Sequence, residues 1–291
     1  MCPAPDFDLA VVTSTRSELG EGPSWWEHTG ELARVDIANG LALFLDPATG
    51  RERVIQLDAP LSAVVARDGG GMIAAVGLEL VAFDADGRRE RSWPVPGDDD
   101  IRLNDCRVDP LGRLWAGTMS KTRAPRRAAL YRLNAAGQLV TVLAPTTLSN
   151  GMGWSPGGGT FYFVDSTEYE ISAFESGTGG DLGERRVFAR IDSSDGLPDG
   201  IAVDADGGVW LALFGGGALR RYHPDGSLDL LIPLPVTNPT CPAFGGDGLA
   251  TLYVTSARIR LDDEQLAREP AGALLALRTG HHGIPTTRFN G

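Results

Sequence analysis

Basic residues are few relative to acidic ones in this 291-residue sequence. Lys and Arg number 26 against 38 Asp and Glu, which gives a formal net charge of −12. Nucleic acids and anionic membrane surfaces are bound by clustered basic side chains, so this balance argues against a nucleic-acid or membrane partner. A small molecule or a cation is the expected ligand.

Cysteine is also scarce, and long apolar runs are missing. Cys2, Cys106 and Cys241 are too few and too scattered for a disulfide framework or a zinc motif, so we expect buried, reduced thiols. No segment approaches the length of a membrane span, and the amino terminus MCPAPDFDLAVV has neither a basic start nor a long apolar stretch. These absences predict a cytoplasmic protein.

A sustained 3.6-residue apolar period is missing as well; the nearest candidate, DDEQLAREP, is short and ends at Pro270. Strand-like runs recur instead, six times, each interrupted by a glycine-containing turn. The turn glycines are spaced by 40, 42, 46, 49 and 41 residues: Gly30, Gly70, Gly112, Gly158, Gly207 and Gly248. A blade of four strands needs about 40–45 residues, so the spacing predicts six four-stranded units. The turns DPATGR, DADGRR, NAAGQL and HPDGSL fall between these glycines and predict outer hairpins.

Six such units predict an all-β fold, a six-bladed β-propeller. The run FDLAVVTST, residues 7–15, precedes the first repeat and has no hairpin partner of its own. We expect it to pair with the last blade near residues 272–280, so that one blade combines both ends of the chain. With 42% hydrophobic and 22% charged residues and no Pro/Ser-rich linker, the sequence predicts one domain over residues 1–291.

The repeat also predicts a ring of polar residues. The positions eight residues before the turn glycines are Gly22, Ser62, Asn104, Asn150, Asp199 and Thr240, with Glu21 beside the first. Equivalent positions of a propeller converge on its axis. Glu21, Asn104, Asn150 and Asp199 together offer oxygen ligands with a charge of −2, which suits a divalent cation such as Ca²⁺, Mg²⁺ or Mn²⁺.

Each ring residue also has a purely local interpretation. Asn150 could belong to an Asn-Gly hairpin, Asp199 to an ordinary Asp-Gly turn, Asn104 to an Asx-turn, and Glu21 could be a solvated loop carboxylate. Independent turns would not be expected to place Asn or Asp at one offset in repeats of unequal length. The common register therefore favours a shared site.

Several motifs carry a resemblance to a known family. LGEGPSWW, RLNDCRVDPLGRLWAGTM, LSNGMGWSPGG and LPDGIAVDADGGVWLALF resemble the signatures of the family that contains regucalcin, the gluconolactonases and the luciferin-regenerating enzyme. The resemblance implies a six-bladed propeller with one divalent metal in its channel, which in this family can be Ca, Zn, Mn, Mg or Fe(II). It implies Glu21, Asn150 and Asp199 as metal ligands, Asn104 as a metal or substrate contact, and Arg102 as a contact of substrate hydroxyls.

The segment after AGTM departs from the family pattern. Animal members carry an acidic, sugar-binding residue there, whereas this chain has SKTRAPRR, with Thr122 at the matching position. Thr122 is the expected substrate contact, and the change leaves the choice of lactone open. The basic run Lys121, Arg123, Arg126 and Arg127 is either a solvated loop or a channel-mouth segment that attracts an anionic substrate.

Three hypotheses about function follow. The first is metal-dependent hydrolysis of a sugar lactone to its aldonic acid, with Asp199 as general base and Arg102 and Asn104 holding the sugar hydroxyls. The second is another hydrolysis, or a cyclisation, of a secondary metabolite on the same metal. The third is a calcium-binding regulatory or interaction propeller without turnover. A Ser-His-Asp scheme has no support, because the sequence lacks a G-x-S-x-G motif and has no His beside a ring position.

Overall fold

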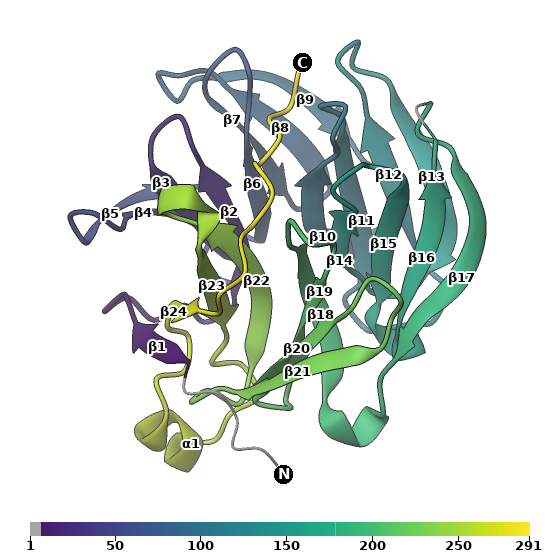
Figure 1. Ribbon diagram of the computed structural model, residues 1–291. Helices are drawn as coiled ribbons and strands as arrows, with labels where there is room; N and C mark the ends of the chain where they lie inside the picture. The colour runs from purple at the N-terminus through teal and green to yellow at the C-terminus, as the bar shows by residue number, and fades with distance from the viewer. Residues whose placement is uncertain (1–6, 178) are drawn as a thin grey trace.

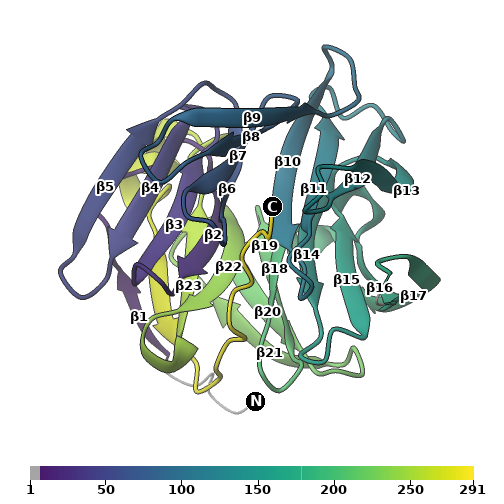
Figure 2. The same cartoon turned by 90° about the horizontal axis from the view of Figure 1, so that it is seen from above.

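The fold is a ring of six four-stranded antiparallel sheets, as the computed structural model of residues 7–177 and 179–291 shows (Figures 1 and 2). The innermost strands of the sheets are β2, β6, β10, β14, β18 and β22, and each contacts the innermost strands of both neighbouring sheets. The predicted six-bladed propeller is confirmed.

The six blades have the following strands. The first contains β2 (Gly20–Trp26), β3 (Glu31–Asp36), β4 (Leu41–Asp46) and β5 (Arg51–Gln56). The second contains β6 (Leu61–Ala66), β7 (Met72–Val76), β8 (Glu79–Phe83) and β9 (Arg89–Pro94). The third contains β10 (Ile101–Val108), β11 (Leu114–Ser120), β12 (Ala128–Leu133) and β13 (Leu139–Thr146).

The fourth contains β14 (Ser149–Trp154), β15 (Thr160–Asp165), β16 (Glu170–Ser176) and β17 (Leu182–Arg190). The fifth contains β18 (Leu197–Val203), β19 (Val209–Phe214), β20 (Ala218–Tyr222) and β21 (Leu228–Pro233). The sixth contains β22 (Pro239–Gly245), β23 (Thr251–Ser256), β24 (Leu275–Arg278) and β1 (Asp8–Val11).

The two ends of the chain close the ring in the sixth blade. Strand β1 pairs antiparallel with β24, and the register places Asp8 opposite Arg278 and Val11 opposite Leu275. Because β24 also pairs with β23, the amino-terminal strand completes a sheet whose other three strands come from the end of the chain. The predicted pairing of residues 7–15 with residues 272–280 is therefore confirmed.

The repeated turns have the geometry that their residues favour. All six turn glycines lie between the first and second strands of a blade and have positive φ, which side chains with a Cβ rarely adopt. In two of these turns an aspartate holds the loop. Oδ1 of Asp109 accepts hydrogen bonds from the backbone N–H groups of Leu111 and Arg113, and its Oδ2 accepts one from Trp115 Nε1 at 2.8 Å. Asp204 binds Trp210 Nε1 in the same way.

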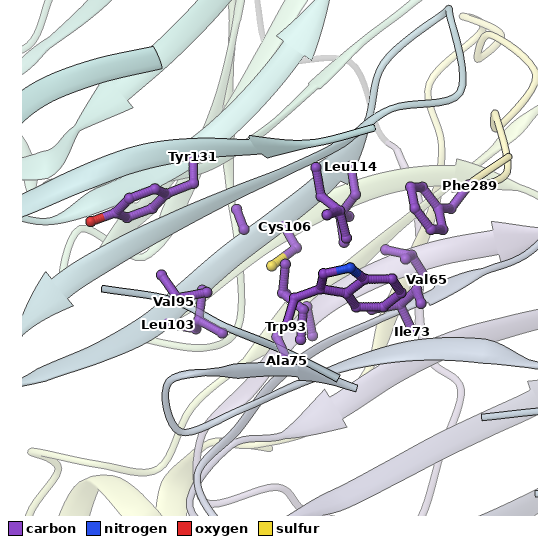
Figure 3. Packing of buried hydrophobic residues seen from close by; sticks show 14 of the residues in the cluster. Val65, Ile73, Ala75, Trp93, Val95, Leu103, Cys106, Leu114, Tyr131 and Phe289 are labelled. Carbon is purple, nitrogen blue, oxygen red and sulfur yellow. The ribbon is translucent and has the colours of Figure 1, made fainter. Parts of the chain in front are cut away.

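The hydrophobic core lies between neighbouring sheets. One cluster joins the second and third blades, where Cys106 packs among Leu103, Leu114 and Trp93 (Figure 3). Phe289 from the carboxy-terminal segment is fully buried in this cluster, with its ring centroid 6.4 Å from that of Trp93.

The cysteine prediction is confirmed where it can be compared with the structure. Cys106 and Cys241 are buried free thiols. Burial raises the pKa of both thiols well above the usual range, so they behave as small apolar side chains. Cys2 lies outside the described residues.

Helical structure is confined to short segments. Contrary to the expectation from periodicity, residues Asp263–Arg268 form an α-helix, α1, because Asp262 and Gln265 make a capping box at its start. The 3-10 turns are η1 (Ser166–Glu168), η2 (Ser193–Asp195) and η3 (Asp247–Leu249). Among the described residues, no helix has the length and apolar character needed to cross a membrane.

The innermost strands approach each other so closely that one glycine has no room for a side chain. A Cβ added at Gly151 in β14 would lie 2.6 Å from the backbone nitrogen of Ile201 and 2.7 Å from the carbonyl oxygen of Asp199 in β18. We expect Gly151→Ala to lower the free energy of unfolding by about 1–3 kcal/mol, the usual cost of overpacking. Urea denaturation measures this, with Gly157→Ala as the matched control, because a Cβ there meets no atom within 4 Å. Equal stability of the two variants would contradict the prediction.

Candidate metal centre

A β-bulge marks the ring position in every blade. The pairing with the second strand shifts register between Glu21 and Ser24 in β2, between Leu103 and Cys106 in β10, between Ser149 and Met152 in β14, and between Pro198 and Ile201 in β18; β6 and β22 have equivalent shifts. A bulge breaks the strict alternation of a strand and redirects side chains near it. The repeated offset in the sequence therefore corresponds to a β-bulge that recurs in every blade.

Most of the residues predicted to hold metal or substrate share one pocket at an end of the ring. It has a volume of about 80 Å³. Its polar wall consists of Glu21, Arg102, Asn104, Arg123, Asn150 and Asp199, and its apolar wall includes Met119, Leu148, Phe214 and Ile259. Five of the six residues predicted to hold metal or substrate thus come together here, and Thr122 does not line this pocket.

The other ring positions are used to join blades. The hydroxyl of Ser62 donates to the carbonyl oxygen of Leu103 in the next blade at 2.6 Å. Thr240 Oγ1 donates to the carbonyl oxygen of Gly20 at 2.6 Å. Because these hydroxyls bind neighbouring backbone and Gly22 has no side chain, the ligand-type residues come from only part of the ring.

Two further aspartates bind the loops that lead to the ring residues. Neither was singled out from the sequence. Asp36 accepts hydrogen bonds from the backbone N–H groups of Glu18 and Leu19, which lead to Glu21. Asp165 accepts the equivalent pair from residues 147 and 148, which lead to Asn150. Both aspartates end the second strand of their blade, six and seven residues after the turn glycine. An aspartate at the end of the second strand-like run, six or seven residues after the turn glycine, was a signal that could have identified them.

The two ring amides orient each other. Asn104 Nδ2 donates to the carbonyl oxygen of Ser149 at 2.9 Å and to Oδ1 of Asn150 at 3.2 Å. Asn150 Nδ2 in turn donates to Ser166 Oγ at 3.0 Å. Because its amide nitrogen is held in this way, Asn150 presents its oxygen on the side that faces Asn104 and the pocket.

The carboxylates at this end of the channel are buried without partners that would neutralise them. Burial, together with repulsion by Asp105, raises the pKa of Glu21 to about 8. Burial also raises the pKa of Asp105, and burial with repulsion by Glu21 and Asp105 raises the pKa of Asp199 well above its ordinary value. Within the described part of the chain, neither Asp199 Oδ1 nor Asp105 Oδ2 has a hydrogen-bond partner, although both atoms are buried.

These features fit a divalent cation. A buried carboxylate oxygen without a partner is costly, and a bound cation would remove both the missing interaction and the repulsion. The available donors are oxygens of two carboxylates and one amide, from Glu21, Asp199 and Asn150, which suit hard cations. Among residues 7–177 and 179–291, no three His, Cys, Asp or Glu side chains form a metal cluster by themselves. The fit therefore depends on the amide oxygen of Asn150.

Three arginines surround the carboxylates without forming ion pairs to them in the described structure. Arg102 Nη1 donates to the carbonyl oxygen of Leu103 at 2.8 Å, and burial lowers the pKa of Arg102 to about 10. Arg123 lies at the pocket mouth, where burial and the nearby Arg260 lower its pKa. Asp105 lies within the bulge of β10, whose register shifts between Leu103 and Cys106, and Arg107 follows the bulge; the place of Arg107 was not predicted from the sequence.

The basic loop is divided between two roles. Lys121 Nζ donates to the carbonyl oxygen of Asp99 at 2.8 Å, and Arg127 pairs with Asp98.

Thr122 is exposed, its N–H donates to Asp100 Oδ1 at 3.0 Å, and its hydroxyl lies 3.1 Å from Ser120 Oγ. Arg123 has a positive φ of 60° and lines the pocket. The neighbour of Thr122, rather than Thr122 itself, therefore faces the site.

Comparisons with known proteins agree with this architecture. A family model described as "SMP-30/Gluconolactonase/LRE-like region" matches residues 19–258. The chain is 37% identical to L-arabinolactonase of Azospirillum brasilense, over 99% of this chain and 97% of that protein. It is 33% identical to regucalcin of Gallus gallus, over 97% of this chain and 98% of the relative. The solved structure of a calcium-binding protein, regucalcin, from Agrobacterium tumefaciens str. C58 superposes with a TM-score of 0.91 at 29% identity and covers 98% of each chain.

Proposed function

The chain belongs to the SMP-30/gluconolactonase/LRE-like family, and from this premise we propose that it is a metal-dependent lactonase that opens a sugar lactone to its aldonic acid. One observation carries the proposal: Asp199 is buried, its Oδ1 has no hydrogen-bond partner among residues 7–177 and 179–291, and it lies in the same small pocket as Glu21, Asn150 and Arg102. Such a pocket combines a cation site with hydrogen-bond donors for a polar substrate.

The residues have distinct roles in this reaction. Glu21, Asn150 and Asp199 would hold the cation. When bound, a divalent cation supplies Lewis acidity toward the lactone carbonyl and the negative charge that develops on its oxygen. Because no residue that the structure describes donates a hydrogen bond to Asp199 Oδ1, this carboxylate oxygen can accept the proton of the attacking water.

The polar and apolar walls of the pocket would orient the substrate. Arg102 and Asn104 bind sugar hydroxyls, since both line the pocket. Arg102 has N–H groups beyond those bound to the protein, whereas both amide hydrogens of Asn104 are used within the protein, so Asn104 offers its carbonyl oxygen as an acceptor. Phe214 and Ile259 offer an apolar surface to the C–H face of a sugar ring. The small volume of the pocket, about 80 Å³, argues against a large substrate. L-arabinolactone is the first compound to test, because a relative is named for it.

A screen of five- and six-carbon aldonolactones with a pH indicator tests the proposal. The purified protein is freed of metal and assayed alone and with Ca²⁺, Zn²⁺, Mn²⁺, Mg²⁺ or Fe²⁺. We expect acid release well above the spontaneous rate with at least one lactone and one metal. No release in any combination, with calcium binding intact, would instead favour a binding propeller without turnover.

Metal binding should be linked to protons through Glu21. Without metal, Glu21 keeps its proton up to a pH of about 8 in the folded protein, whereas the free side chain loses it near 4.5. A raised pKa contributes stability that is full below the unfolded value and lost as pH rises through the folded value. Calcium replaces that proton, so the calcium-induced rise in Tm should grow between about pH 5 and pH 8.

Thermal unfolding at several pH values, with and without saturating calcium, measures this linkage. Glu21→Gln is the matched control, because it keeps the size of the side chain and cannot titrate. We expect the pH dependence of the calcium effect to become much flatter in this variant. A calcium-induced rise in Tm that is the same at pH 5 and pH 8 in the native protein would contradict the prediction.

Ionic strength distinguishes a neutral lactone from an anionic substrate. Arg123 and Arg260 lie near the pocket mouth, and a positive mouth accelerates only the capture of anions. For a neutral aldonolactone we expect kcat/KM to change less than about twofold between low and physiological salt. A steep decline that Arg123→Gln removes would instead identify an anionic substrate.

A further inference from the structure

A second cavity lies on the side of the ring opposite the candidate metal centre. It has a volume of about 210 Å³, and its lining residues differ entirely from those of the metal pocket. Aromatic and aliphatic side chains form most of its wall, among them Trp25, Trp154, Phe244, Val65 and Val203. Arg107 is the one charged residue among its lining residues, all of which belong to the described part of the chain.

Arg107 reaches this cavity because of the bulge in β10. Arg102, before the bulge, and Asn104, within it, line the metal pocket; Arg107, after the bulge, lies toward the opposite end of the same strand. Its Nη1 donates to the carbonyl oxygen of Pro23 at 2.8 Å, and its Nη2 contacts Cys241 Sγ at 3.1 Å. These contacts use only part of its five N–H groups and fix the guanidinium at the inner end of the cavity.

No anion of the protein pairs with Arg107 within the described structure. None of the ion pairs there includes it, and the nearby Asp105 and Glu21 act on it only at longer range. A guanidinium at the end of an apolar cavity is complementary to a carboxylate that brings an apolar body with it. A sugar, which needs many hydrogen-bond partners, would find few on these walls.

The carboxy-terminal segment covers this end of the channel. Figure 2 shows it crossing from the fifth blade toward the second near the middle of the ring. Gly283 forms a bridge with Asp204, and Phe289 pairs with Arg67, so the segment is attached on both sides. Between these attachments, Ile284, Pro285, Thr286 and Thr287 line the cavity. The cavity therefore has a roof formed by the chain itself.

We propose that this cavity binds a small monocarboxylate with an apolar body of about the size of a benzene ring, whose carboxylate pairs with Arg107. An apolar cavity of about 150 Å³ is enough to hold benzene, so the larger volume here leaves room for the carboxylate. The proposal concerns a site separate from the metal pocket and does not rest on lactonase activity.

Isothermal titration of the full-length protein with benzoate tests the proposal, with benzamide as the uncharged probe of the same shape. The titration is done without metal, so that a carboxylate cannot bind through a cation. We expect saturable benzoate binding, and the affinity for benzamide should be weaker by about tenfold or more. A hydrogen bond between charged groups is stronger than one between neutral groups, and the difference in free energy corresponds to about this change in affinity. No saturable binding of benzoate at millimolar concentrations would overturn the proposal, and so would equal binding of the two probes.

Variants at opposite ends of the channel locate the binding. Arg107→Met should weaken benzoate binding at least tenfold, and Arg107→Lys should retain part of it. Val203→Phe should fill the cavity and abolish binding without removing the charge. Circular dichroism and calcium binding verify that each of these cavity variants is folded.

Asp199→Asn is the matched control in the metal pocket and should bind benzoate as the native protein does. If Asp199→Asn abolished binding and Val203→Phe did not, the carboxylate would belong to the metal pocket and the proposal would be wrong.

Discussion

Asp199→Asn should reduce kcat for lactone hydrolysis roughly 10²–10⁴-fold, even when metal and substrate are saturating. The substitution keeps an oxygen ligand of similar size but removes the negative charge and the site that accepts a proton. The loss corresponds to about 3–5 kcal/mol of transition-state stabilisation, which an excess of metal cannot restore. The measurement is kcat with metal occupancy determined directly on the same sample.

Asn150→Ala is the matched comparison. It removes a neutral ligand and leaves Asp199 in place, so much of the lost rate should return as the metal concentration is raised. If fully loaded Asp199→Asn reached nearly the native kcat, Asp199 would be a ligand only. Glu21 and Asp105, the other buried carboxylates near the pocket, would then be the next candidates for the base.

Chelation of the metal should lower the rate of hydrolysis by about 10³-fold or more and leave the propeller folded. The rate falls because polarisation of the carbonyl by a cation is worth several kcal/mol. The fold survives because its cores lie between neighbouring sheets, two of them without any residue of the metal pocket, and chain ends paired in β1 and β24 close the ring. This distinguishes the protein from small domains that fold only with metal.

Activity and far-UV circular dichroism, recorded on the same chelated sample, measure both parts of this prediction. Activity should return when the metal is added back, which verifies that chelation has not damaged the protein. Loss of the β-sheet signal on chelation would contradict the expected independence of the fold. Activity that persists in a sample shown to be free of metal would contradict the expected dependence on a cation.

The fold could be predicted because the turn residues of its blades repeat along the sequence. Each blade places a glycine of positive φ between its first two strands, and these glycines recur in the sequence at blade-sized intervals. The pairing of β1 with β24 followed from an unpaired strand at the start of a repeating chain. Helix α1 was missed because a capping box, rather than an apolar period, begins it.

The candidate site could be predicted only where side chains follow the repeat. Asn104, Asn150 and Asp199 occupy one offset, and the structure brings them to one pocket with Glu21 and Arg102. The metal-binding and catalytic roles assigned to these residues stay predictions. The repeat was informative because a bulge recurs at this position in all six innermost strands.

Residues beyond the bulge could not be placed from the sequence. Simple alternation along β10 does not account for an extra residue, so the place of Arg107 toward the opposite end of the channel was not expected. The loop after β11 shows the same limit. Thr122 matched the family position by its place after the AGTM motif, yet the positive φ of Arg123 turns the loop so that Arg123 lines the pocket.

The most direct test of metal-dependent catalysis is a titration of the metal-free protein in which bound metal and hydrolysis rate are measured on the same samples. We expect the rate to rise in proportion to occupancy and to reach its plateau at one cation per chain. Glu21→Gln should shift the midpoint to higher metal concentration, because a charged ligand is lost. A rate that is independent of occupancy, or a plateau reached with no cation bound, would contradict metal-dependent catalysis.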